Sequence, residues 1–506
     1  MQALISPLSE LAEFGELYKI RKEKAGMIRV CGCVNSQKTH MMYALSDGCK
    51  YKVIACPSES KAKQVYEEYR FLDGDTYLYP AKDLLFYQAD LRSKELARQR
   101  MEVIEAVILK ESITVVTSFD AFMDSLLPKK VIKDRVIRIA GDTAVDMDEM
   151  SLRLSEIGYD REEQVEGPGQ FAVRGGILDI YPLTGELPVR IELWGDEVDS
   201  IRTFDVESQR SIENLAETVI YPAIEFPREN EERVSFLEYF DREDTLLFLD
   251  EPLRLLEKGQ GVEEEFMEAQ KKRIESGYEM SDMEARLYTA EEIVRRMNAY
   301  RSIGLMALEM RCKGFEVRET YNLQCKSVNP YNNSFDMLTQ DLKRLKRNGY
   351  RVILLSGSRT RAKRLAEDLR DYNLSSFYSD DMKREVQPGE IMTVYGYVAE
   401  GYEYPFLKFT VISETDIFGK IKKKKKRRVY EGRKIQSFAQ LKPGDYVVHE
   451  SHGLGIYQGI EKIEVDKISK DYMKISYAKG GNLYIPATQL DLIQKYAGAD
   501  ARKPKL

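Results

Sequence analysis

The most recognisable chemical spacing in the chain lies near its start, at Gly32–Thr39 (GCVNSQKT). A phosphate-binding P-loop follows the pattern GxxxxGK[ST] between a strand and a helix. Its glycines let backbone N–H groups surround the phosphates, and its lysine neutralises their charge. Here Gly32, Lys38 and Thr39 are in register, but Gln37 replaces the second glycine. Because a side chain there obstructs the approach of backbone to phosphate, we interpret the motif as a degenerate P-loop.

A later acidic segment offers a partner for this loop. Leu246–Glu251 (LLFLDE) resembles a Walker B strand, whose acidic residue holds Mg²⁺. One interpretation is a nucleotide site that uses Lys38, Thr39, Asp250 and Glu251. The other interpretation is a sheet that has lost nucleotide binding, in which a buried strand simply ends in two acidic residues. The replacement of the second glycine by Gln37 favours this second interpretation. We therefore expect no catalytic residue and no cofactor in this chain.

A histidine-rich segment, His449–His452 (HESH), has the composition of a zinc motif but lacks its spacing. The zinc motif HExxH places both imidazoles on one face of a helix. Here the two histidines are only three positions apart, where a strand is expected to enter a turn. The sequence therefore predicts no metal site.

The lysine run Lys422–Lys426, extended by Arg427 and Arg428, has two interpretations. It is either a solvated tether or a segment that attracts the phosphate backbone of DNA. The chain as a whole does not have the charge of a nucleic-acid binder, because its 77 basic and 84 acidic residues give a net charge of only −7.

Composition also bears on the compartment. The six cysteines show no CxxC pair and no regular framework, and we find neither a signal peptide nor an apolar run of about 18 residues. A reduced, cytoplasmic setting without a membrane span is therefore the expectation.

The elements that must position the P-loop remnant follow from hydrophobic patterning. Met27–Cys33, Lys52–Cys56 and Thr114–Thr117 have the pattern of buried strands. Helical stretches, Ser60–Phe71 and Lys94–Leu109, lie between them. Short apolar strands that alternate with helices predict a parallel sheet.

The residue pattern then changes several times along the chain. Phe171–Pro182 and Val189–Asp205 alternate in polarity and carry Gly and Pro turns, which predicts a small inserted antiparallel sheet. Leu342–Tyr372 predicts another α/β unit. Gly419–Lys434 is basic and lacks hydrophobic periodicity, so we expect a linker. Phe438–Tyr496 is again rich in strand-forming residues, with glycines at its bends.

Three stretches in this order resemble one family. The α/β start with its degenerate P-loop, the segment FAVRGGILDIYP…IELWGDEVDSIRTFD, and the module at Pro443–Leu490 are similar to bacterial transcription-repair coupling factors. The first two also resemble UvrB, and the third resembles the polymerase-binding module of CarD-type transcription factors. The resemblance implies a multidomain α/β fold: a UvrB-like domain with an inserted β-rich domain, a further α/β domain, and a small CarD/Tudor-like β-barrel.

The resemblance also divides the chain into expected parts. These are a UvrB-like domain 1a at 1–118, a UvrA-binding insert at 119–208, domain 1b at 209–335, a small α/β domain of unknown role at 336–418, a basic linker at 419–436, and an RNA polymerase-interaction domain at 437–498.

For the insert, the resemblance implies a UvrA-binding face made of arginines and an aromatic residue. By position, the expected contacts are Arg174, Phe171, Arg161 and Tyr181. Arginine with an aromatic side chain is the usual composition of an interface hot spot, although core packing is the default for Phe171. UvrB tends to have another arginine where this chain has Ala172, so the UvrB contact set is not complete here.

For the last domain, the resemblance implies an edge strand that pairs with the β subunit of RNA polymerase. Such β-augmentation draws its affinity from backbone hydrogen bonds. The matching strand is about Gly459–Val465, with Ile463 as the expected contact and Lys462 and Glu464 beside it. The alternative is that Ile463 faces the core of the barrel.

The family displaces RNA polymerase stalled at a DNA lesion with an ATP-driven double-stranded-DNA translocase and recruits nucleotide excision repair through UvrA. The resemblance implies that ATP, Mg²⁺ and most DNA binding belong to that motor, which we expect to be missing because the chain stops at Leu506. This chain is then expected to be a monomeric adaptor between UvrA and polymerase. The alternatives are a nucleotide-binding enzyme and a DNA-binding module centred on the lysine run.

Overall fold

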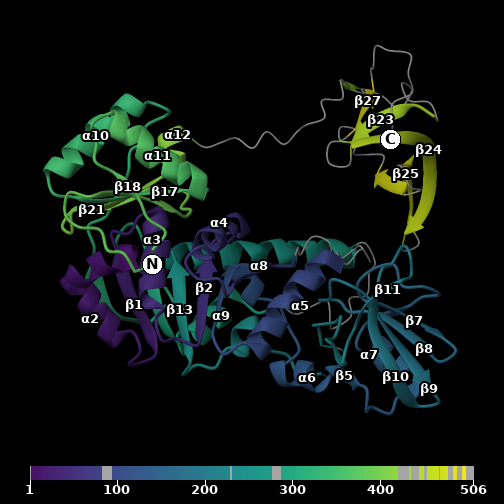
Figure 1. Ribbon diagram of the computed structural model, residues 1–506. Coiled ribbons are helices and arrows are strands. Elements are labelled where there is room, and N and C mark those ends of the chain that lie inside the picture. Colours follow the sequence, from purple (N-terminus) through teal and green to yellow (C-terminus); the bar gives the residue numbers. More distant parts are fainter. Residues whose placement is uncertain are drawn as a thin grey trace. The chain divides into compact units, whose positions relative to one another are not determined.

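The computed structural model describes residues 2–82, 94–227, 231–275, 287–381, 383–419, 432–434, 444–449, 453–465, 468–476, 482–486 and 493–496. The chain forms two compact units, Met1–Lys420 and Ile421–Leu506. Both units are drawn in Figure 1. The lysine run Lys422–Arg428 lies outside the described residues.

The first unit is built on a seven-stranded sheet in the order β15-β1-β14-β13-β2-β4-β3. Every pairing in it is parallel, which confirms the predicted sheet. Its strands are β1 (Gly26–Cys31), β2 (Tyr51–Cys56), β3 (Thr76–Tyr79), β4 (Ile113–Ser118), β13 (Thr245–Asp250), β14 (Arg301–Leu305) and β15 (Val317–Asn322). The central strands β2, β4 and β13 are buried along their whole length, as strands covered on both faces must be.

Two hydrophobic clusters fill the space on the two faces of this sheet. The helices that supply much of them are α1 (Gln2–Ile5), α2 (Ala12–Ile20), α3 (Asn35–Leu45), α4 (Glu59–Tyr69), α5 (Lys94–Leu109), α6 (Lys129–Asp134), α8 (Pro252–Glu275) and α9 (Ala290–Met297), with 3-10 turns at η1 (Ser6–Glu10), η3 (Phe119–Phe122) and η4 (Phe236–Tyr239). The predicted helix at 94–109 is observed with the same bounds.

An antiparallel sheet follows, in the order β11-β10-β9-β8-β7-β6. Its strands are β6 (Asp160–Arg161), β7 (Gln170–Arg174), β8 (Ile177–Tyr181), β9 (Val189–Trp194), β10 (Glu197–Phe204) and β11 (Ser211–Asn214). Only the short β6–β7 pairing is parallel. One face packs with α7 (Met147–Glu156) and with the two-stranded ribbon of β5 (Ile137–Ala140) and β12 (Glu217–Ile220). A small β-rich insert was predicted here, and the structure confirms it.

A third sheet has the order β16-β20-β21-β17-β19-β18. Its strands are β16 (Lys326–Ser327), β17 (Arg351–Ser356), β18 (Phe377–Tyr378), β19 (Ile391–Tyr395), β20 (Tyr402–Tyr404) and β21 (Phe409–Ser413), and its helices are α10 (Phe335–Arg347), α11 (Arg359–Asp371) and α12 (Glu414–Phe418). This sheet shares a hydrophobic cluster with α3 and α4 of the first sheet. The third sheet therefore packs directly against the P-loop helix.

The second unit is a six-stranded antiparallel sheet in the order β22-β27-β23-β24-β25-β26. Its strands are β22 (Gly432–Lys434), β23 (Tyr446–His449), β24 (Gly453–Val465), β25 (Ile468–Ser476), β26 (Asn482–Pro486) and β27 (Ile493–Tyr496). Closure of these strands into a barrel stays a prediction. Strand β22 lies inside the stretch that the sequence assigns to the linker.

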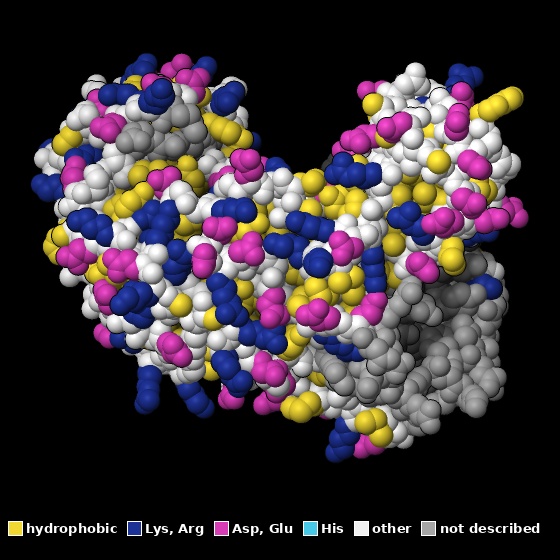
Figure 2. Space-filling view, turned by 90° about the horizontal axis from the view of Figure 1, so that it is seen from below, with side chains coloured by type: hydrophobic (Ala, Val, Ile, Leu, Met, Phe, Trp, Pro, Cys, Tyr) yellow, Lys and Arg dark blue, Asp and Glu magenta, His cyan; other side chains and the backbone are white. Residues whose placement is uncertain are grey.

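On the face of the molecule in Figure 2, basic and acidic side chains are interspersed, in keeping with the near balance of charge in the sequence. In the part of the chain that the structure describes, no helix combines the length and the apolar character needed to cross a membrane.

Candidate functional site

The P-loop remnant occupies the turn between β1 and α3. Gly32 has φ +78°, and a Cβ at this position would lie 1.9 Å from the carbonyl oxygen of Leu323. Only glycine fits such a conformation and such a close approach. The structure also brings the predicted residues together, since the Nζ of Lys38 lies 2.6 Å from Oδ1 of Asp250 and 2.6 Å from Oε1 of Glu251 at the end of β13.

Lys38 is held in a closed ion pair. Lys38 is 6% exposed to solvent, and Asp250 is 2% exposed. Burial alone lowers the pKa of the Lys38 amine, but Asp250 and Glu251 outweigh it and the net pKa is raised. Glu251 also accepts a hydrogen bond from the backbone N–H of Ala307 at 2.9 Å. The charge that binds phosphate in a P-loop is therefore already neutralised by the protein.

Gln37, the residue that breaks the motif, is fully buried. Its Oε1 accepts a hydrogen bond from the N–H of Val34 at 3.1 Å, and its Nε2 donates to the hydroxyl of Tyr404 at 2.9 Å. The first contact satisfies a donor at the start of α3 that has no partner within the helix. The second joins the P-loop helix to β20, so Gln37 acts as an internal cap and a link between sheets.

Thr39, whose hydroxyl would reach a magnesium ion in a working site, instead donates to Glu68 at 2.7 Å. Ser36 donates to the same carboxylate, also at 2.7 Å. Glu68 is almost fully buried and accepts a further bond from the N–H of Ala399 at 3.1 Å. The N–H of Glu400 in turn donates to the Ser36 hydroxyl at 3.2 Å. A segment of the third sheet's domain therefore covers the start of α3.

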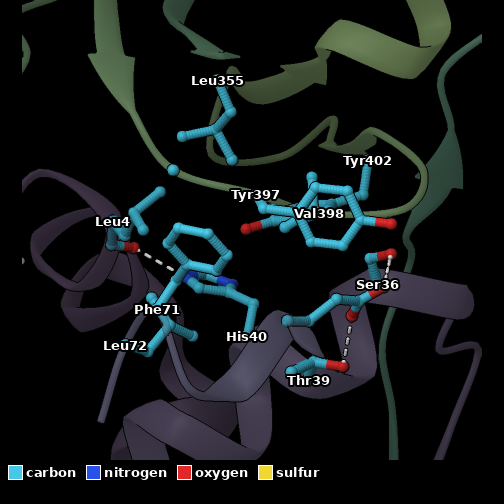
Figure 3. A pocket seen from close by; sticks show the side chains of 12 residues that line it. Leu4, Ser36, Thr39, His40, Phe71, Leu72, Leu355, Tyr397, Val398 and Tyr402 are labelled. Atoms are coloured by element: carbon cyan, nitrogen blue, oxygen red, sulfur yellow. Dashed lines mark hydrogen bonds between the residues drawn. The ribbon is translucent and has the colours of Figure 1, made fainter. Parts of the chain in front are cut away.

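The last polar side chain of this helix turn, His40, is buried beneath the same segment (Figure 3). Its Nε2 lies 2.7 Å from the carbonyl oxygen of Leu4, to which it donates, and its Nδ1 then accepts from the Tyr404 hydroxyl at 3.0 Å. Burial lowers the pKa of His40 to about 4, against a smaller opposing effect of the Leu4 carbonyl. The imidazole is therefore neutral at physiological pH.

The space that remains beside these residues is small. The cavity lined by Ser36, Thr39, His40, Val398 and Tyr402 has a volume of ≈ 20 Å³. That is room for about one water molecule. This cavity is too small for a nucleotide. Sequence reasoning found Lys38 and its two acids but missed Glu68 and Tyr404, because neither belongs to a motif.

The predicted UvrA contacts lie on the six-stranded insert. Arg174 ends β7 with its side chain 46% exposed, and its guanidinium pairs with Asp179 at 2.6 Å. Arg161 is exposed on β6, and the hydroxyl of the half-buried Tyr181 donates to the carbonyl of Glu186 at 3.0 Å. Phe171 is fully buried in the core of the insert. Its side chain has no exposed surface to offer a partner, so the structure agrees with core packing, the default role for Phe171.

The predicted polymerase contacts lie on β24. Lys462, Ile463 and Glu464 form consecutive pairs with residues of β25. Strand β23, the other neighbour of β24, pairs only with Gly453–Ile456. In the described pairings, the stretch Gly459–Val465 therefore has a partner strand on one side only.

The described residues contain no group of three His, Cys, Asp or Glu side chains placed to hold a metal ion. His449 lies in β23, and His452 lies outside the described residues. All six cysteines are unpaired.

Two family models match parts of the chain. Residues 137–226 match the UvrB interaction domain, and residues 441–497 match the CarD-like/TRCF RID domain. The first range covers the antiparallel insert with α7, and the second covers β23 to β27.

Curated relatives extend the likeness to most of the chain. The transcription-repair-coupling factor of Bacillus subtilis is 32% identical over 496 residues, which covers 86% of this chain and 42% of that protein. Those of Staphylococcus haemolyticus and Staphylococcus epidermidis are each 27% identical with the same coverage. A hypothetical ATP-dependent RNA helicase from Sulfolobus tokodaii aligns over 78% of this chain and 82% of its own, but with a TM-score of 0.23 and 11% identity it supports no argument.

The matches therefore agree with the order of modules along the sequence. The two family models cover the insert and the final sheet, and the Bacillus subtilis relative matches 86% of the chain. The chain spans about two fifths of the length of the curated relatives it matches, and over most of its own length it is similar to transcription-repair-coupling factors.

Proposed function

We propose that this chain is an adaptor that holds UvrA by its insert and the β subunit of RNA polymerase by its final sheet. In the complete reaction, stalled polymerase is displaced at a DNA lesion and nucleotide excision repair is recruited to the same place. The observation that carries the proposal is that one chain matches both the UvrB interaction domain, at 137–226, and the CarD-like/TRCF RID domain, at 441–497.

At the insert, the proposed UvrA contact is centred on Arg174. Its guanidinium is half exposed yet positioned by Asp179, whose carboxylate also accepts from Arg190 at 2.7 Å. Because Asp179 keeps a second cation, Arg174 can turn to a carboxylate of a partner without leaving a buried charge unpaired. Arg161 and Tyr181 lie on neighbouring strands and are proposed as secondary contacts.

At the final sheet, the proposal relies on the stretch Gly459–Val465 of β24. Its single described partner strand leaves one row of backbone N–H and C=O groups for another strand. An added strand gains backbone hydrogen bonds there. Ile463, with Lys462 and Glu464 on either side, would then set the register.

We also propose that this chain does not hydrolyse ATP. Lys38 is paired with Asp250 and Glu251, and Thr39 with Glu68, so the groups that would hold a nucleotide and its Mg²⁺ are engaged with protein atoms. ATP-driven translocation on DNA would then be the work of another part of the whole protein. The nucleotide-enzyme alternative requires this network to open.

The test is a binding assay of the chain with purified UvrA and, separately, with the polymerase β subunit. Arg174→Ala is expected to lose UvrA alone, and Ile463→Arg to lose polymerase alone. Arg138→Ala serves as the matched control, because Arg138 is an exposed arginine of the same insert on β5, away from the β7–β8 turn. A wild-type chain that binds neither protein would refute the adaptor proposal.

A further inference from the structure

Trp194, the single tryptophan of the chain, is 84% exposed at the end of β9. Tryptophan buries a large apolar area when it is covered and has a hydrogen-bond donor at its edge, so it is among the residues most enriched in interface hot spots. Among the described residues, the hydrophobic core of the insert is formed by other side chains and does not include Trp194.

The turn that carries Trp194 is held from two sides. Trp194 pairs with Glu197 across a two-residue turn whose first residue, Gly195, has φ +65°. The N–H of Val145 donates to the carbonyl of Asp196 at 2.8 Å. On the other side, the N–H of Leu193 donates to the carbonyl of Gly176 at 2.8 Å. A side chain presented on such a fixed turn gives up less conformational entropy on binding than one on a free loop.

Strand register places Trp194 beside the proposed UvrA contact. Arg174 pairs with Ile177, and Ile177 pairs with Glu192, so these three residues share one face of the sheet. Trp194 follows Glu192 by two positions on β9 and therefore lies on that same face. The β7–β8 turn, Gly175–Gly176, and the β9–β10 turn are at the same end of the sheet.

The charges on this face favour a protein partner over nucleic acid. Arg174 and Arg190 pair with Asp179, and Arg202 pairs with Glu192. A nucleic-acid surface requires a row of cations free to contact phosphates. An exposed indole beside paired arginines is instead the composition of a protein–protein hot spot.

We propose that Trp194 is the apolar anchor of the UvrA-binding surface. Its indole ring is covered by an apolar pocket of UvrA, while Arg174 at the neighbouring turn pairs with a carboxylate beside that pocket. This inference rests on the proposed UvrA-binding function and extends it from the arginine of β7 to the tip of the β9–β10 hairpin.

The first experiment compares the affinity of wild-type chain and variants for purified UvrA by titration calorimetry. Trp194→Ala is expected to weaken binding by at least about tenfold, and Trp194→Phe by less, because phenylalanine keeps part of the apolar area. The control is Ile212→Ala, which removes a side chain 56% exposed on β11 of the same insert and should change the affinity by less than about twofold.

The second experiment uses the fact that the chain has one tryptophan. Replacing it with 5-hydroxytryptophan gives a fluorophore that is excited apart from the tryptophans of UvrA. Acrylamide should quench it efficiently in the free chain and much less after UvrA is added. Protection that rises with the concentration of the chain alone would assign the face to self-association and overturn the inference.

The two proposals fail in different ways. If wild type binds UvrA and Arg174→Ala does not, but Trp194→Ala binds as wild type does, the adaptor function stands and the anchor is wrong. The same holds if the fluorophore stays fully quenchable in the complex. If wild type does not bind UvrA at all, the proposed function itself is wrong.

Discussion

The start of α3 and the turn end of the antiparallel insert differ in where their functional side chains are directed. At α3, Lys38 and Thr39 keep the positions of a P-loop and Gln37 replaces its second glycine, yet each of the three is bonded to another part of the protein. At the insert, the sequence assigns no role to Trp194, yet its side chain is exposed to solvent on a fixed turn. Residues at the positions of a binding motif can thus serve to stabilise the fold, while a residue to which the sequence assigns no role is exposed and available for binding.

The two regions should also differ in how substitutions affect the free energies of folding and binding. Removing a side chain from the α3 site should cost folding free energy and leave binding of partners unchanged. Removing one from the turn end of the insert should do the opposite. The predictions below follow this contrast from the largest expected effect to the smallest.

Lys38→Met is expected to lower the free energy of unfolding by about 3–5 kcal/mol, because it leaves the buried carboxylate of Asp250 without its cation. Chemical denaturation monitored by far-UV circular dichroism measures the loss. The control is the triple variant Lys38→Met, Asp250→Asn, Glu251→Gln, which removes both charges with the lysine and should recover most of the stability. A single variant as stable as wild type would show that the ion pair does not hold this site closed.

His40 should make the chain lose stability in acid. Its pKa is lowered from 6.5 to about 4 by burial, so the unfolded chain binds this proton more readily than the folded chain. The contribution of neutral His40 is complete above pH 6.5 and is lost as the pH falls towards 4, by about 3 kcal/mol.

The measurement is the difference between wild type and His40→Gln in unfolding free energy across this pH range, since the other acidic groups affect both proteins alike. The difference should shrink or reverse as the pH falls. Parallel pH profiles would show that folding does not lower the pKa of His40.

Trp194→Ala should change the free energy of unfolding by less than about 0.5 kcal/mol, as expected for an exposed side chain outside the core. The same denaturation assay measures it, and Leu178→Ala in the core of the insert provides the contrast, with an expected loss of about 2–5 kcal/mol. A large loss for Trp194→Ala would mean that the indole supports the fold, and would remove the contrast between the two regions.

Mg-ATP should leave the melting temperature of the chain unchanged, because a ligand stabilises a protein only when it binds the folded state. Differential scanning fluorimetry with and without nucleotide is sufficient. A rise in melting temperature that disappears in Lys38→Met would show that the network at α3 opens to admit nucleotide, and the proposed lack of ATP hydrolysis would have to be reconsidered.

Much of the fold could be predicted from local pattern. Strands β1, β2 and β4 and helix α5 are close to their predicted bounds, since their apolar residues have clear periodicity. The sequence grouped Lys38 with Asp250 and Glu251 as one candidate nucleotide site, and the structure places these three side chains in contact. The expected roles of Arg174 and Ile463 stay predictions, as do the expected domain boundaries.

Other features could not be predicted, for a physical reason. Glu68 and Tyr404 close the α3 site through contacts between residues far apart in the chain, and hydrophobic periodicity carries no information about such partners. The position of β15 beside β1 has the same origin. Trp194 was within a recognised segment, but its sequence position did not reveal that its side chain is exposed.

The order of strands in the first sheet also limits when each strand can pair while the chain is being synthesised. Strand β1 pairs only with β14 and β15, through Arg301 and Val317 among others. At about 5–20 residues per second, Arg301 emerges roughly 15–60 s after Gly26. Strands β2, β3 and β4 can associate within that interval, but β1 must wait with its apolar side chains uncovered. The first strand to be made is thus among the last to enter its sheet.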